Sequence, residues 1–183
     1  MNQTQQQYEA VIARCKSLFL KKAQDYGTSW RILRMPSITD QIYIKAERIR
    51  SIQESGENKV GDSIEGEFMG IINYCAIALI LWKFQGKDEQ EIEAKVSNLA
   101  DLETLYDEQV TMSYEVMEKK NHDYGEAWRK MRISSITDLI LMKIFRLKKI
   151  EDNKGELLVS EGVDANYVDM LNYAVFSLIK MNV

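Results

Sequence analysis

An internal repeat constrains the fold of this chain more than any other feature of its sequence. Residues 21–49 and 119–147 align without a gap and are identical at 15 of 29 positions. Most of the identical residues are polar, aromatic or glycine, so the repeat has kept more than its packing positions. Further along, Asn73-Tyr74 matches Asn172-Tyr173 after a one-residue shift. We therefore divide the chain into repeat one (1–85), a charged linker (86–98) and repeat two (99–183).

Composition favours helices throughout. The 183 residues include a single Pro and nine Gly, too few chain breakers for a strand-rich fold. Each repeat predicts three long helices and a short one, and the third long helix is apolar on most sides, as expected of a buried central helix. One repeat on its own would expose the apolar faces of its helices to water. We therefore expect an all-α fold, with one domain formed as a pseudo-twofold helical bundle from two tandem repeats of about three long helices each.

The repeated segment also predicts where helices begin and end. The first long helix of each repeat should end at Gly27 or Gly125, because glycine takes the left-handed cap conformation without a Cβ clash. The second should begin at a Ser-x-x-Asp pattern typical of a capping box. Asp40 in repeat one and Asp138 in repeat two are therefore expected to act as capping residues.

Charge and cysteine content narrow the function classes. A net charge of -4 argues against binding of bulk nucleic acid, which relies on neutralising phosphates. Cys15 and Cys75 are not repeated and have no metal or redox spacing, so we expect free thiols in a reducing compartment. The N-terminus does not resemble a signal peptide, and the most apolar stretch, 71–82, is too short to span a bilayer. We expect a cytoplasmic protein without a membrane partner.

Two equivalent lysines, Lys45 and Lys143, are the first candidates for a binding site. Each projects from an apolar stripe on its predicted helix, where an unpaired ammonium group would cost several kcal/mol if buried. Such a lysine must reach water, pair with an acid from a neighbouring helix, or meet an anionic ligand. Arg48 and Arg146 follow three residues later on the same side of the helix. Together the four predict a phosphate clamp, with an internal ion pair as the alternative.

Repeated aromatic and amide residues are candidates for the rest of a pocket. Aromatic faces can stack on a flat base, although the same residues could simply pack a helical corner. Asparagines within an apolar helix need hydrogen-bond partners, and pairing across the pseudo-twofold axis is the alternative to ligand binding. The candidates are Tyr26, Trp30, Tyr124, Trp128, Asn73 and Asn172.

A metal site is a further hypothesis. Carboxylates are the ligands that Mg²⁺ prefers, and the acidic candidates are Asp25, Asp123, Glu47, Glu67 and Asp169. The two copies differ most at these positions, since Glu67 aligns with Asn166 and Asp169 with Gly70. One repeat has therefore lost a site, or the two build a composite site. For Asp25 and Asp123, at a helix C-terminus, compensation by neighbouring lysines is the alternative to a metal.

The repeated motifs resemble a known family. The pattern Lys-x-x-x-Asp-Tyr-Gly-x-x-Trp, then Ser-Ile-Thr-Asp-x-Ile-x-x-Lys-x-x-Arg, then an Asn-Tyr helix is similar to the nucleotide modification associated domain 1 family. The resemblance covers nearly the whole chain as two tandem copies. It implies a bacterial or phage-related protein of nucleotide metabolism, without an established activity.

A more distant likeness is to the all-helical, MazG-like nucleotide pyrophosphohydrolases, which hold magnesium with Glu-x-x-Glu and Glu-x-x-Asp motifs. That set is incomplete here, because Gly70 and Asn166 stand where an acid is needed. The leading hypothesis is binding of a nucleotide or another phosphorylated small molecule, with Mg²⁺-dependent hydrolysis as its enzymatic form. The competing hypothesis is a structural or adaptor protein whose repeated polar residues form internal caps and ion pairs. A homo-oligomer is compatible with either, and no sequence feature fixes the oligomeric state.

Overall fold

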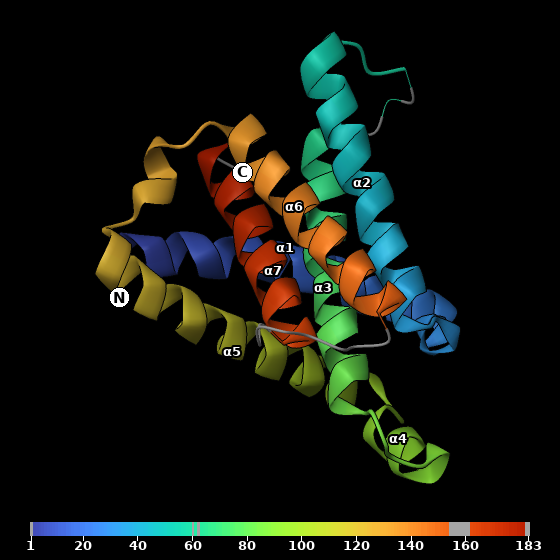
Figure 1. Ribbon diagram of the computed structural model, residues 1–183. Helices are drawn as coiled ribbons and strands as arrows, with labels where there is room; N and C mark the ends of the chain where they lie inside the picture. The colour runs from blue at the N-terminus through green and yellow to red at the C-terminus, as the bar shows by residue number, and fades with distance from the viewer. Residues whose placement is uncertain (1, 60, 62, 154–161, 182–183) are drawn as a thin grey trace.

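The computed structural model describes residues 2–59, 61, 63–153 and 162–181, and these residues form helices and loops without a strand (Figure 1). The all-α prediction is confirmed. The elements, in chain order, are α1 (Gln3–Tyr26), the 3-10 helix η1 (Ser29–Ile32), α2 (Met35–Ser55), α3 (Ile64–Lys83), α4 (Glu89–Lys95), α5 (Leu99–Tyr124), the 3-10 helix η2 (Ala127–Lys130), α6 (Ile133–Asp152) and α7 (Val163–Lys180).

The order of elements follows the repeat. Repeat one supplies α1, η1, α2 and α3, and repeat two supplies α5, η2, α6 and α7 in the same order. At the centre α3 packs against α7, with α2 on α3 and α6 on α7, while α2 and α6 also pack together. Helices α1 and α5 lie across this group of four (Figure 1). The charged linker contains the short helix α4, which the sequence analysis did not predict.

Helix α3 is the most apolar element and lies at the centre of the bundle. Its buried residues follow one another with little interruption from Phe68 to Ile80, so the helix needs neighbours on most sides. Among the described residues it is the one helix long and apolar enough to cross a membrane, but 61% of that stretch is buried within the protein. Packing against α2 and α7 accounts for its composition.

Two buried tyrosine–asparagine pairs connect the repeats. The Tyr8 hydroxyl on α1 donates to Asn172 Oδ1 on α7 at 2.9 Å, and the Tyr106 hydroxyl on α5 donates to Asn73 Oδ1 on α3 at 2.8 Å. Each asparagine Nδ2 donates in turn to a backbone carbonyl of the outer helix in its own repeat. The asparagine side chains therefore hold the two halves together, in the manner expected of pairing about the pseudo-twofold axis.

The expected capping boxes do not form. Helix α2 begins at Met35 and α6 at Ile133, two residues before the serines that should have capped them, and neither N-cap has a side-chain hydrogen bond. Pro36 lies in the first turn of α2, where its fixed φ suits a helix start and its missing N–H removes no helical hydrogen bond. The prediction placed the helix start too late because it relied on a side-chain pattern alone.

The two aspartates assigned to these caps form ion pairs between the repeats instead. Asp40 on α2 contacts Lys148 on α6 at 2.6 Å, and Asp138 on α6 lies 3.9 Å from Arg50 on α2. Arg50 and Lys148 are equivalent positions, so the contact is made twice about the pseudo-twofold axis. Asp40 and Asp138 thus support the packing of α2 on α6 from its exposed side.

The glycine after each outer helix turns the chain as predicted in one repeat and differently in the other. Gly125 adopts the left-handed conformation, with φ 59° and ψ 39°. Gly27 shares the positive φ of 61° but has ψ -144°, outside that region. Both positive φ values favour glycine. Each turn leads into a single 3-10 turn that carries a tryptophan, Trp30 or Trp128.

Candidate functional site

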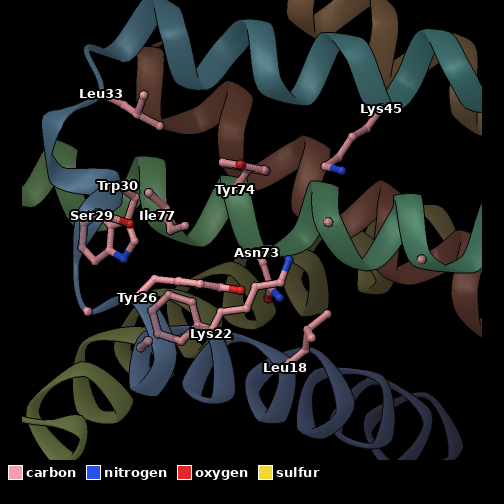
Figure 2. Close-up of a pocket in the computed structure, with 15 residues that line it drawn as sticks. Leu18, Lys22, Tyr26, Ser29, Trp30, Leu33, Lys45, Asn73, Tyr74 and Ile77 are labelled. Carbon is pink, nitrogen blue, oxygen red and sulfur yellow. The ribbon is translucent and has the colours of Figure 1, made fainter. Parts of the chain in front are cut away.

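A large cavity lies in repeat one, between the C-terminal half of α1, the turn η1, and helices α2 and α3 (Figure 2). Its volume is about 600 Å³. We call it the repeat-one pocket. The polar and aromatic residues that line it are Phe19, Lys22, Tyr26, Ser29, Trp30, Lys45, Asn73 and Tyr74.

Two lysines give this pocket its charge. Lys22 reaches in from α1 and Lys45 from α2, and Figure 2 shows both amines directed into the space between the helices. No carboxylate lines the pocket within the described part of the chain. Lys22 is exposed and makes no ion pair with any described residue. The pocket therefore presents net positive charge to whatever enters it.

Lys45 is held by one acid from the neighbouring helix. Its Nζ lies 3.1 Å from Glu67 Oε2 on α3, and its side chain remains 26% exposed. Arg48 binds the other oxygen of the same carboxylate. Two cations thus share one anion, and the Lys45 amine also lies 6.0 Å from the centre of the Tyr74 ring. The ion-pair alternative from the sequence is realised for Lys45.

Gly70 makes room for the Lys45 side chain. A Cβ added at this position on α3 would lie 2.7 Å from Lys45 Cε and 3.1 Å from Nζ. Real Cβ atoms do not come so close, so any larger residue would push the lysine aside. Glycine within a helix is otherwise unfavourable by roughly 0.5–1 kcal/mol relative to alanine. The local sequence is therefore arranged around the path of Lys45.

Aromatic rings also line the repeat-one pocket. Tyr26 is 69% exposed at the mouth, while Trp30 is half-buried and packs on the core. The buried indole nitrogen of Trp30 has no hydrogen-bond partner among the described residues. Tyr26 and Trp30 come from either side of the Gly27 turn, so the repeated Asp-Tyr-Gly-x-x-Trp motif positions both rings at one pocket.

Repeat two contains an equivalent cavity of about 390 Å³. We call it the repeat-two pocket. Six of its residues occupy the positions equivalent to six residues of the first pocket and have the same identity: Lys120, Tyr124, Trp128, Lys143, Asn172 and Tyr173. The internal repeat therefore reproduces a complete pocket, and not only a set of helices.

The repeat-two pocket differs by holding its own anion. Asp169, which stands where repeat one has Gly70, places Oδ2 2.8 Å from Lys143 Nζ and binds Lys120 with its other oxygen. The Lys143 side chain is only 7% exposed. Burial in this region also raises the pKa of the Tyr173 hydroxyl. Both lysines of this pocket thus share an internal carboxylate.

The aromatic wall of the repeat-two pocket is also occupied from within. Trp128 stacks on Phe176, with ring centres 4.3 Å apart and planes within 3°. The guanidinium of Arg129 lies 4.3 Å from the Trp128 ring. Repeat one has Ile77 at the position of Phe176, and isoleucine has no ring to stack on Trp30.

The arginines expected to complete a phosphate clamp lie elsewhere. Arg48 points to Glu67 and to Asn58 Oδ1, at 3.1 Å from the latter, and lines a shallower cavity at the end of α2. Arg146 is exposed on the outer face of α6 and lines a different open cavity. The three-residue spacing puts each arginine near its lysine along the helix, but only the lysine lines the pocket.

The five carboxylates expected to hold a metal are not gathered. No group of three His, Cys, Asp or Glu side chains suited to a metal ion occurs among the residues that the structure describes. Glu67 and Asp169 are bound by lysines, and Asp25 and Asp123 are exposed at the ends of α1 and α5. Glu47 lies on α2 and lines neither pocket. These five carboxylates do not fit a Mg²⁺ site, which needs several carboxylate oxygens facing one point.

Three pocket residues were missing from the sequence-based candidates. Lys22 had been considered only as compensation for a helix C-terminus, and Tyr74 only as a marker of the repeat. Lys22 and Tyr74 are each identical in the two copies, and this identity could have marked them as pocket residues. Gly70 was noted only because a metal site would need an acid there, whereas in the structure it leaves space for the Lys45 side chain.

Comparison with known proteins gives one match. The sequence model of nucleotide modification associated domain 1 matches residues 22–81 and 120–181, so each matched segment contains both lysines and both aromatic residues of one pocket. Comparisons with curated proteins and with solved structures found no match. The two segments cover most of the chain, which therefore belongs to the nucleotide modification associated domain 1 family and carries two tandem copies of that domain.

Proposed function

We propose that this protein binds a nucleotide, or a closely related phosphorylated small molecule, in the repeat-one pocket. The observation that carries the proposal is the pair of lysines, Lys22 and Lys45, directed into a cavity that no described carboxylate lines. Two ammonium groups are suited to a phosphate, because charge-assisted hydrogen bonds to phosphate oxygens are stronger than neutral ones. The net negative charge of the whole chain directs the proposal to a small ligand rather than to a nucleic acid.

The shape and the lining of the pocket support the same ligand class. A volume of about 600 Å³ lies within the range of roughly 300–1,000 Å³ that is usual for small-molecule sites. Tyr26 and Trp30 offer ring faces for stacking on a base, a contact that any base can make. The family description places the domain in the context of nucleotide modification, which fits a nucleotide ligand.

The proposal is binding and not hydrolysis. Cleavage of a pyrophosphate bond in the manner of the MazG-like enzymes needs carboxylates that converge on magnesium. In this chain Glu67 holds Lys45 and Arg48, and Asp169 holds Lys120 and Lys143. These acids stabilise cations of the protein itself, so the geometry favours a receptor for the nucleotide.

A purely structural or adaptor role is the second candidate, and repeat two favours it. There the lysine, the tryptophan and the asparagine of the repeated motif all have partners within the protein. If repeat one behaved in the same way, replacing its lysines would change stability alone. The two candidates therefore separate in a binding assay on repeat one.

The test is calorimetry and thermal shift with a panel of 5′-nucleotides, each with and without Mg²⁺. Lys22→Met and Lys45→Met should weaken binding by about tenfold or more, the usual consequence of losing a charged hydrogen bond. Lys21→Met is the matched control, because Lys21 is the exposed neighbour of Lys22 and does not line the pocket. Absence of binding by every nucleotide, or equal losses in all three variants, would contradict the proposal.

A further inference from the structure

The position shared by Gly70 and Asp169 distinguishes the two pockets. In repeat two, Asp169 supplies a carboxylate between Lys120 and Lys143. In repeat one, the equivalent lysines are Lys22 and Lys45, and the position of the acid is a glycine over which the Lys45 side chain lies. Repeat two therefore shows what a lysine pair at these two positions accepts: one compact anionic group, bound by a different lysine through each of its oxygens.

We propose that the phosphate of the ligand binds between Lys22 and Lys45, in the place that the Asp169 carboxylate fills in repeat two, and that repeat two is closed by its own side chains. The protein then binds one ligand per chain, in repeat one alone. This inference rests on the proposed function and adds to it the anion subsite, the stoichiometry and the residue that sets them. Asp169 acts as a built-in substitute for the ligand.

Lys45 can turn to a ligand at small cost. Its partner Glu67 is also bound by Arg48, so the carboxylate keeps a cation when the lysine leaves. The Lys45 side chain lies over Gly70 with 26% of its surface exposed. Lys143, by contrast, has a side chain only 7% exposed and an acid that belongs to the same pocket. Breaking that buried pair to admit a ligand would be expensive.

The aromatic residues support the same asymmetry. In repeat two the ring of Phe176 lies parallel to Trp128, where a base would have to stack. Ile77 takes this position in repeat one and leaves the Trp30 side of the pocket wider, in keeping with cavity volumes of about 600 and 390 Å³. In repeat two, side chains of the protein therefore occupy both the position of the anion and the position of the stacked base.

Calorimetric titration with adenosine and thymidine 5′-monophosphates tests this inference, with adenosine and thymidine as ligands that lack the phosphate. The tighter monophosphate should bind with one equivalent per chain, and its nucleoside should bind about tenfold more weakly or worse, because the lysines then have no anion to bind. Lys22→Met should weaken monophosphate binding about tenfold, whereas the equivalent change in repeat two, Lys120→Met, should leave it within about twofold.

A pair of substitutions at one position separates charge from space. Gly70→Asp gives repeat one the acid of repeat two and should abolish binding, while Gly70→Asn has nearly the same size without the charge and should bind at least about tenfold better than Gly70→Asp. Circular dichroism checks that both variants fold. If Gly70→Asp does not fold, the comparison of Lys22→Met with Lys120→Met tests whether the ligand binds in repeat one alone.

The outcomes distinguish the inference from the function on which it rests. Two equivalents per chain, equal losses in Lys22→Met and Lys120→Met, or equal binding by Gly70→Asp and Gly70→Asn would overturn the inference and leave nucleotide binding standing. A nucleoside that binds as tightly as its monophosphate would overturn the anion subsite. Wild-type protein that binds no 5′-nucleotide of the panel and neither monophosphate would overturn both.

Discussion

The two pockets share six residues and differ in what lies between their lysines. In repeat one the lysines face an open cavity, and in repeat two Asp169 joins them. A duplicated domain can therefore keep its motif in both copies while only one copy keeps a free site. In our proposal, the residue at the position between the lysines determines which copy takes a ligand.

The core of the molecule offers the opposite comparison, because there the two repeats are alike. Tyr8 and Tyr106 each donate to the asparagine of the other repeat, at 2.9 and 2.8 Å. The pairs that hold α2 to α6 are likewise made twice. These two sets of contacts between the halves are kept in both directions, as expected if each half needs the other to bury its apolar face.

The largest expected effect comes from the acid that distinguishes the pockets. Asp169→Ala should lower the free energy of unfolding by about 3 kcal/mol, since it removes a carboxylate that is paired with the nearly buried Lys143. Glu67→Ala should cost less, about 1–2 kcal/mol, because Lys45 and Arg48 are more exposed and can turn to water. Urea denaturation measures both. A larger loss in Glu67→Ala would remove the distinction between a closed and an open pocket.

The buried tyrosine pairs should give equal effects in the two halves. Tyr8→Phe and Tyr106→Phe each leave a buried asparagine oxygen without its donor, so each should lower the free energy of unfolding by about 2 kcal/mol. The same urea titrations measure this difference, and a wild-type slope with denaturant shows that the unfolded state is unchanged. Losses of stability that differ severalfold would show that the two tyrosine–asparagine pairs are energetically unequal despite their similar distances.

The ion pairs between α2 and α6 should contribute little in either half. Both are largely exposed, so a double-mutant cycle on Asp40 and Lys148 should give a coupling below about 1 kcal/mol. The cycle on Asp138 and Arg50 should give a smaller coupling energy, because Asp138 Oδ1 and Arg50 Nη1 are 3.9 Å apart. Salt should reduce both values. Couplings of several kcal/mol would mean that these aspartates do more than orient the two helices.

The smallest effect is expected from the thiols, both of which lie in repeat one. Burial raises the pKa of Cys15 to about 12 and also raises the pKa of Cys75, so neither should react with a thiol reagent at pH 8 while the protein is folded. Since the unfolded thiols ionise near pH 8.5, stability should fall as the pH rises from there towards 12. Fast labelling of either thiol would show that repeat one opens apart from repeat two.

Much of the fold followed from the sequence. The all-α fold, the three long helices and one short helix of each repeat, and the Gly125 cap were predictable because they depend on local chemistry and on the apolar pattern. The starts of α2 and α6 were not, because the serine and aspartate pattern that suggests a cap also suits residues within the first turns. Asp40 and Asp138 find their partners on another helix, a relation that no local motif contains.

The site was only partly predictable. Lys45 and Lys143 were identified because a charge on an apolar stripe needs a partner. Arg48 and Arg146 were predicted to belong to the same clamp, but they line other cavities, since neighbours along a helix can point into different cavities. The partner of Lys45 in the pocket, Lys22, comes from another helix and needed the tertiary arrangement to be recognised.

The most direct test of the account is a crystal structure of the protein with a nucleoside 5′-monophosphate that it binds. We expect phosphate density between Lys22 and Lys45, with the base against Tyr26 or Trp30, and Asp169 still joining Lys120 to Lys143 in a ligand-free repeat two. A nucleotide in the repeat-two pocket, with Asp169 turned away, would contradict the central claim.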